Sequence, residues 1–156
     1  YIVSELKSKK IPDLRKELGI VFQDFKLLPG MNVEENIAYA MKAVGKNREE
    51  IERKLTETLK FVGMEHKRHS LDLSGGEAQR VAIGRAVANE PKIILADEPT
   101  GNLDIHNALL IIDMLEKINQ RGTTVIMTTH NLDLVQKFKH RTLRMENGHI
   151  VSDIRP

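Results

Sequence analysis

The sequence contains no cysteine and no tryptophan, and only 4% of its residues are aromatic. Without cysteine the chain has no disulfide and no thiolate to offer a metal, which fits a reducing cytoplasm. No apolar run approaches the roughly 20 residues that a bilayer-spanning helix needs, so we expect any link to a membrane to be made through a partner. Lys plus Arg (24) nearly balances Asp plus Glu (22), and this gives no reason to expect nucleic-acid binding.

The sequence also lacks the phosphate-binding pattern G-x-x-x-x-G-K-[ST]. Its one Gly-Lys pair, Gly45-Lys46, has Ala40 at the first glycine position, and it ends a predicted helix instead of following a strand. The chain begins at Tyr1 and not at Met, so we expect a fragment or a truncated reading frame. Its 156 residues suffice for one core, and we expect a single domain over residues 1–156.

The most informative stretch begins with a Leu-Ser-Gly-Gly-Glu turn at residues 73–77. Ser74 and Glu77 match a capping box, which is a common helix start without chemistry. Capping does not account for the two adjacent glycines, which weaken a first helical turn. Glycines there would let an anion approach backbone N–H groups at the positive end of the helix.

A strand ending in two acids follows. The four apolar residues 93–96 predict a strand buried on both faces of a parallel sheet, and such sheets bind ligands at the carboxyl ends of their strands. Asp97 would there help to hold Mg²⁺, and Glu98 would orient the water that attacks a γ-phosphate. The alternative is that Asp97 and Glu98 form a solvated turn before Pro99.

Periodicity, caps and turn residues predict the other elements. We expect helices at residues 12–18, 33–44, 47–63, after Gly76 and at 107–120, strands at 20–22 and 123–129, and a hairpin formed by 141–145 and 149–152. The residues expected to be buried in the helix at 107–120 are Leu110, Ile111, Met114, Leu115 and Ile118.

Residues 71–104, read without a gap, resemble the segment of ABC-type ATPases that runs from the LSGGQ signature to the Walker B strand. The resemblance implies an α/β fold with the P-loop NTPase (RecA-like) core of an ABC ATPase, a helical subdomain at about residues 25–88, and ATP and Mg²⁺ as ligands. It covers the whole chain but only the later two-thirds or so of a family domain, without the N-terminal strands and P-loop. We therefore expect residues 1–156 not to hydrolyse ATP unaided.

The resemblance also implies roles for single residues. Gln23 would be the Q-loop glutamine that reaches Mg²⁺ and the attacking water, although a glutamine after a strand is ordinarily a surface residue. His130 would contact the γ-phosphate and tie it to Glu98, although such a histidine is ordinarily a cap or surface residue. The residues that would face the nucleotide held by a second subunit, or that subunit itself, are Leu73, Ser74, Gly75, Gly76, Glu77 and Asp104.

Residues 19–41 and 121–135 are similar to the cell-division members of a branch that also contains lipoprotein-release and macrolide-export ATPases. This implies a homodimer or heterodimer of nucleotide-binding domains, an FtsX-like integral membrane subunit, and a position on the inner face of the plasma membrane. Residues 25–29 would form one edge of the groove that receives a helix of that subunit. The alternative is that they only pack in the local core. Two other functions stay open: a lipoprotein-release or macrolide-export ATPase, and a non-hydrolysing dimerisation or docking module.

Overall fold

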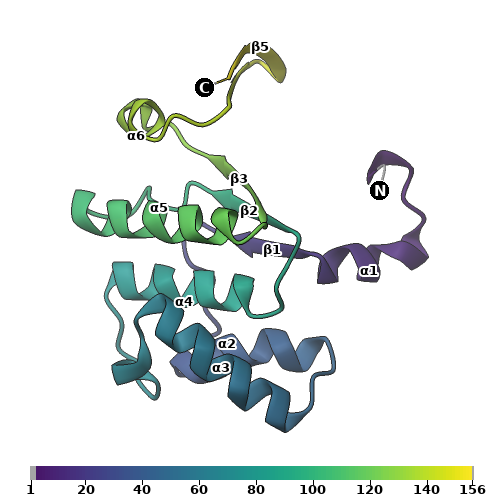
Figure 1. Cartoon of the computed structure of the whole chain (residues 1–156), viewed down its shortest axis with the longest axis vertical. Helices are drawn as coiled ribbons and strands as arrows, with labels where there is room; N and C mark the ends of the chain where they lie inside the picture. The colour runs from purple at the N-terminus through teal and green to yellow at the C-terminus, as the bar shows by residue number, and fades with distance from the viewer. Residues whose placement is uncertain (1–2, 156) are drawn as a thin grey trace.

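The computed structural model describes residues 3–155. Its centre is a three-stranded parallel sheet in the order β1-β2-β3, formed by β1 (Leu18–Val21), β2 (Ile93–Asp97) and β3 (Thr124–Thr128) (Figure 1). Two 3₁₀ turns (Val3–Glu5 and Ser8–Lys10) and α1 (Ile11–Lys16) precede β1, and α5 (Ile105–Gln120) connects β2 to β3. Parallel strands joined through helices make the predicted α/β class.

The register of this sheet brings the three carboxyl ends to one edge. Val21 at the end of β1 pairs with Ala96, and Asp97 at the end of β2 pairs with Thr128 at the end of β3. Residues that follow the three strands therefore emerge side by side, as ligand-binding edges of parallel sheets require.

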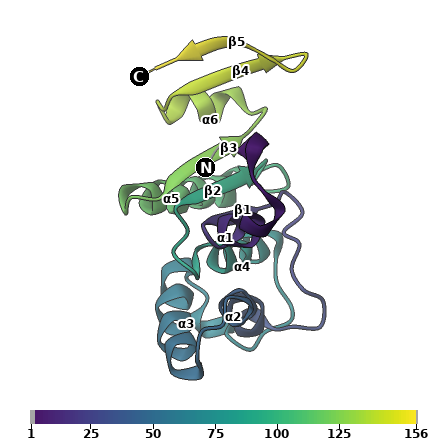
Figure 2. The ribbon, with the colours of Figure 1, turned by 90° about the vertical axis from the view of Figure 1, so that its right-hand side faces the viewer.

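Three helices lie below the sheet: α2 (Val33–Ala43), α3 (Arg48–Val62) and α4 (Gly75–Val87). Of these, α4 packs against β1, and α2 and α3 pack on α4, farther from the sheet (Figure 2). Asn32, Asn47 and Ser74 start them with complete capping boxes. Gly63, with φ 65°, ends α3 in the left-handed conformation that glycine adopts without strain, before a 3₁₀ turn at Glu65–Lys67. These starts and the stop at Gly63 are confirmed. The core side chains of these helices include Ile37, Met41, Leu59, Val62, Val81 and Ile83.

The prediction of a strand buried on both faces is wrong for the described residues. Ile94 and Ala96 of β2 are buried on the face that α4 and α5 cover, whereas Leu95 is 36% exposed on the other. Ile20 and Ile126 lie beside Leu95 in the register and are exposed as well. The apolar run therefore reflects one covered face and one that no helix of residues 3–155 covers.

The predicted boundaries around β1, and the predicted start and burial pattern of α5, were also wrong. The strand expected at 20–22 begins at Leu18, so Gly19 lies inside β1 instead of separating a helix from it. β1 passes close to α4 at this glycine, because a Cβ added at Gly19 would lie 2.6 Å from the carbonyl oxygen of Ala86. In α5, which begins at Ile105, Leu110 is 38% exposed and Ala108 and Ile112 are buried instead.

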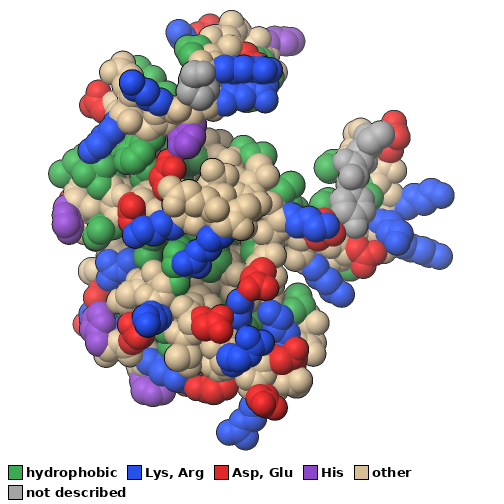
Figure 3. Space-filling model, in the orientation of Figure 1, with side chains coloured by type: hydrophobic (Ala, Val, Ile, Leu, Met, Phe, Trp, Pro, Cys, Tyr) green, Lys and Arg blue, Asp and Glu red, His purple; other side chains and the backbone are tan. Residues whose placement is uncertain are grey.

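The C-terminal part lies at the end of the molecule opposite α2 and α3 (Figure 2). It consists of α6 (Leu132–Lys137), which the sequence analysis did not predict, and the predicted hairpin of β4 (Thr142–Glu146) and β5 (His149–Ile154). Asn147 and Gly148 take positive φ at the turn, as their residue types favour. Basic and acidic side chains are interspersed over α2–α4 on the face in Figure 3. No helix within residues 3–155 is both long and apolar enough to cross a membrane.

The close approach at Gly19 leads to a stability prediction. Gly19→Ala places a methyl group against the Ala86 carbonyl oxygen, so β1 or α4 must shift. We expect the free energy of unfolding to fall by about 1–3 kcal/mol, measured by urea denaturation. Gly75→Ala is the matched control, because its Cβ would lie 3.6 Å from Leu103 in ordinary contact and should change stability by less than about 1 kcal/mol. Equal losses in both variants would contradict the steric explanation.

Candidate functional site

Asp97 lies at the carboxyl edge of the sheet, as predicted. It is the last residue of β2 and is exposed. The Thr128 hydroxyl on β3 donates a hydrogen bond of 2.7 Å to Asp97 Oδ1. The sequence analysis did not identify Thr128, although its place at the end of the next parallel strand was the signal that could have revealed it.

Glu98 and His130 are in direct contact beside Asp97. His130 Nδ1 lies 2.9 Å from Glu98 Oε1, and because an ionised carboxylate only accepts hydrogen bonds, Nδ1 carries the hydrogen. The Glu98 side chain is 22% exposed and that of His130 is 80% exposed. Both residues follow strand ends, so the parallel register produces their contact.

The backbone of Glu98 is held in an unusual conformation. Its φ is 44°, in the left-handed region that residues other than glycine seldom occupy. Its N–H group lies 3.2 Å from the Thr128 carbonyl oxygen and 3.1 Å from the Thr128 hydroxyl, which fixes this turn. Strain of this kind gathers at functional sites, where the surrounding structure holds it.

Gln23 lies against the loop that follows Glu98. Its Nε2 donates to Asn102 Oδ1 at 3.3 Å, and Asn102 Nδ2 donates back to the Gln23 carbonyl at 3.2 Å. A Cβ at Gly101 would come within 2.8 Å of Gln23 Nε2, so a larger residue there would displace the Gln23 side chain. Nothing in the sequence pointed to Asn102, because its contact joins segments 79 residues apart.

The donors at this edge fit Mg²⁺. Asp97 supplies an exposed carboxylate, and Gln23 has an amide oxygen that its contact with Asn102 does not use. Mg²⁺ prefers such oxygen ligands and keeps several waters, so one or two protein donors suffice. Within residues 3–155, no cluster of three or more His, Asp or Glu side chains could hold a metal ion by itself.

The Ser-Gly-Gly turn starts α4 through a capping box that takes up Ser74 and Glu77. Ser74 Oγ accepts a hydrogen bond from the Glu77 N–H at 3.3 Å, and Glu77 Oε2 accepts one from the Ser74 N–H at 2.9 Å. Lys67 Nζ also donates to Glu77 Oε2, at 2.9 Å. The Lys67 hydrogen bond and then the Ser74 N–H lower the pKa of Glu77 to about 2. Leu73, just before the turn, is half-buried and packs against the core.

The two glycines of the turn have different surroundings. A Cβ at Gly76 would lie 2.3 Å from Asn107 Oδ1 on α5, so packing alone requires glycine there. At Gly75 a Cβ would make only ordinary contacts, of 3.6 Å with Leu103 and 3.7 Å with Phe25. Packing therefore explains Gly76 and leaves Gly75 as the glycine suited to a ligand's approach.

Asp104 is joined to this turn through Asn107. It caps α5, with Oδ1 accepting the Asn107 N–H at 2.9 Å and Oδ2 accepting the Asn107 side-chain amide at 2.6 Å. The Asn107 N–H and then its side chain lower the pKa of Asp104. The predicted site residues thus form two groups. The first lies at the strand ends and consists of Gln23, Asp97, Glu98 and His130. The second consists of residues 73–77 at the start of α4 and Asp104 at the start of α5.

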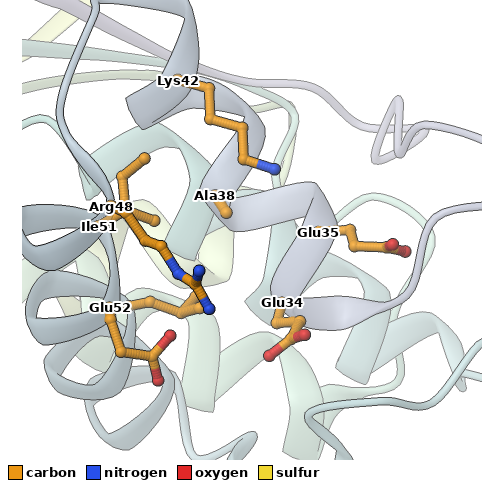
Figure 4. A pocket seen from close by; sticks show the side chains of 8 residues that line it. Glu34, Glu35, Ala38, Lys42, Arg48, Ile51 and Glu52 are labelled. Atoms are coloured by element: carbon orange, nitrogen blue, oxygen red, sulfur yellow. The ribbon is translucent and has the colours of Figure 1, made fainter.

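A groove of about 410 Å³ lies between α2 and α3 (Figure 4). Ala38, Ile51 and Leu55 give it an apolar lining, and charged side chains surround them. The segment at 25–29 packs on the same helix, because Asn36 of α2 accepts the Leu28 N–H at 2.8 Å, and Leu27 packs against the core. Local packing therefore holds for Leu27, and the membrane-groove interpretation of this segment stays a prediction.

Comparisons with known proteins agree with this architecture. The sequence profile of the ABC transporter family matches residues 2–101. The chain is 52% identical over 151 residues to the cell division ATP-binding protein FtsE of Streptococcus pneumoniae, and 45% identical over 153 residues to that of Bacillus subtilis. The alignments cover 96% and 97% of this chain but 66% and 67% of those relatives.

A solved structure is similar as well. The dimeric, post-hydrolysis structure of the ATP-binding cassette MJ0796 bound to ADP and Pi has a TM-score of 0.81 and 32% sequence identity. The similarity covers 97% of this chain and 68% of that one.

The ion pair between Glu77 and Lys67 leads to a pH prediction. The folded-state pKa of about 2 lies below the ordinary 4.5, so the carboxylate stabilises the fold above about pH 4.5, and this contribution is lost as the pH falls toward 2. Glu77→Gln keeps a capping side chain but removes the charge. We expect it to lower the free energy of unfolding by about 1–2 kcal/mol at pH 7, and the difference from wild type to vanish near pH 2.

Glu50→Gln is the matched control for this substitution. It makes the same change in the capping box of α3, at an exposed position. Urea denaturation at several pH values should show a loss below about 0.5 kcal/mol for Glu50→Gln at pH 7. A difference for Glu77→Gln that persists unchanged to pH 2 would contradict the prediction.

Proposed function

The chain belongs to the ABC transporter family, and we propose that the protein containing it binds and hydrolyses ATP as the FtsE-like subunit of a membrane complex. The observation that carries this proposal is the contact of 2.9 Å between His130 and Glu98, next to Asp97 at the carboxyl edge of the sheet. A carboxylate paired with an imidazole and adjoining a magnesium-type donor suits attack of water on a phosphoanhydride.

In this proposal Glu98 orients the attacking water and accepts its proton as the water oxygen bonds to the γ-phosphorus. The bond from the γ-phosphorus to the β,γ-bridging oxygen breaks, so that ADP leaves and inorganic phosphate is released. His130 fixes the Glu98 carboxylate through Nδ1, and its high exposure leaves the rest of the ring open to a phosphate oxygen. Gln23 adds a second polar group toward the water. Mg²⁺, held by Asp97 and Gln23, would supply charge neutralisation for the phosphates.

We propose that the residues at the start of α4, together with Asp104, act in a dimer of nucleotide-binding domains. The Ser74-Gly75 turn and Asp104 would face the ATP and the surface of a second nucleotide-binding domain. The close approach permitted at Gly75 supports this, since packing gives no other reason for glycine there. The ATP-binding cassette MJ0796, which has the same fold, is dimeric with ADP and Pi bound.

The proposed membrane partner is an FtsX-like integral membrane subunit, and the proposed position is the inner face of the plasma membrane. The groove between α2 and α3 is its proposed docking surface, since an apolar lining surrounded by charges suits an amphipathic helix. The names of the relatives from S. pneumoniae and B. subtilis support cell division over lipoprotein release or macrolide export. The chain spans 66% of the first of them, so these assignments concern the whole protein.

Glu98→Gln in the full-length protein tests the catalytic assignment. Loss of the base should lower kcat for ATP hydrolysis by about 100-fold or more. ATP binding should persist and hold the dimer closed, which size-exclusion chromatography with ATP measures. Glu116→Gln is the matched control, because Glu116 also contacts a histidine, His140, away from the strand ends. The assignment would be refuted by a Glu98→Gln protein that hydrolyses ATP like Glu116→Gln.

Ile51→Glu tests the docking surface. Ile51 is half-buried in the groove, so the variant places a charge where the partner's apolar side chains would lie. We expect the affinity for the membrane subunit to fall by about tenfold or more in detergent co-purification, with the ATPase of the isolated subunit retained. Leu143→Glu makes the same kind of change at an exposed position on β4 and should leave the affinity unchanged. Equal retention of both variants by the membrane subunit would remove the groove from the proposal.

A further inference from the structure

Gln79, one turn into α4, is a completely buried amide that the assigned roles leave unused. Its exposed fraction is 0%. Its Nε2 donates to the Pro99 carbonyl at 2.8 Å and to the Phe22 carbonyl at 3.3 Å. Because both partners are carbonyl oxygens, the nitrogen end of the amide must face them.

These two carbonyls belong to the neighbours of the proposed catalytic residues. Phe22 directly precedes Gln23, and Pro99 directly follows Glu98. One side chain therefore fixes the spacing between the two loops that carry the water-orienting groups. These loops come from different strands, and among residues 3–155 the other hydrogen bonds between Gln23 and the second loop are those with Asn102.

Arg85, further along α4, holds the other end of the loop that carries Gln23. Its Nη1 donates to the Lys26 carbonyl at 2.6 Å, and its Nη2 donates to the Phe25 carbonyl at 3.1 Å. Phe25 and Lys26 both have positive φ, 62° and 46°, which needs such external support. Residues 22–26 are thus held at both ends by α4, with Gln23 between the two contacts.

We infer that Gln79 is a positioning residue for ATP hydrolysis, which holds Gln23 and Glu98 at their working separation and links both to the helix that begins with the Ser-Gly-Gly turn. The inference rests on the proposed function. Misplacement of a reacting group by about 1 Å can cost about 100-fold in rate, so a clamp of this kind acts mainly on kcat.

Replacing this amide has two opposing effects on the stability of the fold. Among the described residues, Gln79 Oε1 is buried without a hydrogen-bond partner, which is unfavourable. Methionine has nearly the same length and carries no such oxygen, so Gln79→Met loses the two donated bonds but also removes an unsatisfied polar atom. The Pro99 and Phe22 carbonyls also lose their donor, so stability should fall modestly while the two loops lose their common anchor.

The test is ATP hydrolysis by full-length protein with Gln79→Met. We expect kcat to fall about 10- to 100-fold, with KM for ATP within about threefold of wild type. The Mg²⁺ concentration for half-maximal rate should rise, because Gln23 is a proposed ligand, and the thermal midpoint should stay within about 4 °C.

Asn89→Leu is the matched control. Asn89 is also an amide that donates to a carbonyl, Ala40 at 2.8 Å, and its Oδ1 is also buried without a partner among the described residues. Its contact joins the turn that follows α4 to α2, away from the strand ends, so kcat should be unchanged. A general loosening of α4 would lower kcat in both variants.

A double-mutant cycle shows whether Gln79 acts through Gln23. In a Gln23→Ala background, Gln79→Met should lower kcat by less than about threefold, because residues that act as a unit are not additive. Full additivity, or a Gln79→Met protein with the kcat of Asn89→Leu, would overturn the inference. If Gln79→Met does not fold, Arg85→Met replaces it, since methionine donates to neither the Lys26 nor the Phe25 carbonyl, and an unchanged kcat there would overturn the clamp.

The results that would contradict the proposed function differ from those that would contradict the positioning role of Gln79. A wild-type protein that does not hydrolyse ATP, or one whose rate Glu98→Gln leaves unchanged, contradicts the ATPase assignment itself. A wild-type protein that is active and sensitive to Glu98→Gln, with a Gln79→Met variant as active as wild type, contradicts only the positioning role.

Discussion

The parallel register of β1, β2 and β3 is the constraint on which the site depends. Residues that follow three separate strands meet because Val21 aligns with Ala96 and Asp97 aligns with Thr128. A slip of one residue in β3 would turn Thr128 to the other face of the sheet and separate it from Asp97. The buried side chains of β2 that face α4 and α5 set this register. The position of the polar residues at the edge of the sheet therefore depends on the packing of the apolar strand.

Local signals in the sequence predicted much of the fold. Asn32, Asn47 and Ser74 each precede a glutamate by three residues, and each starts a helix with a capping box because both partners lie within four residues. The end of the strand at Asp97 and the hairpin turn at Asn147-Gly148 could also be predicted from local residue types. The start of β1 and the exposure of Leu110 were not, because both depend on which surface another element covers. Helix α6 was missed because six residues show too little periodicity.

The candidate site was predictable in its residue types and not in its supports. Asp97, Glu98 and His130 follow strands, so topology alone suggests that they meet. Thr128, Asn102 and Gln79 act through contacts that cross 20 to 79 residues of sequence, and no short motif encodes such distances. The Ser-Gly-Gly turn is instructive in another way: its capping interpretation is confirmed, and its anion-site interpretation stays a prediction. Capping accounts for Ser74 and Glu77, packing against Asn107 accounts for Gly76, and Gly75 alone is left for a ligand.

Helix α4 gives these parts a mechanical connection. Its first turn holds the group proposed to face a second subunit, its second turn holds the loops of Gln23 and Glu98 through Gln79, and its last turn holds residues 25–26 through Arg85. A helix with buried Val81 and Ile83 in its middle moves as a rigid body, because a packed core does not deform continuously. In the proposed function, a displacement of the turn by a nucleotide would therefore reach the residues proposed to orient the water within one helical turn. Two groups that are remote in the sequence are linked in the fold because a single helix contacts both.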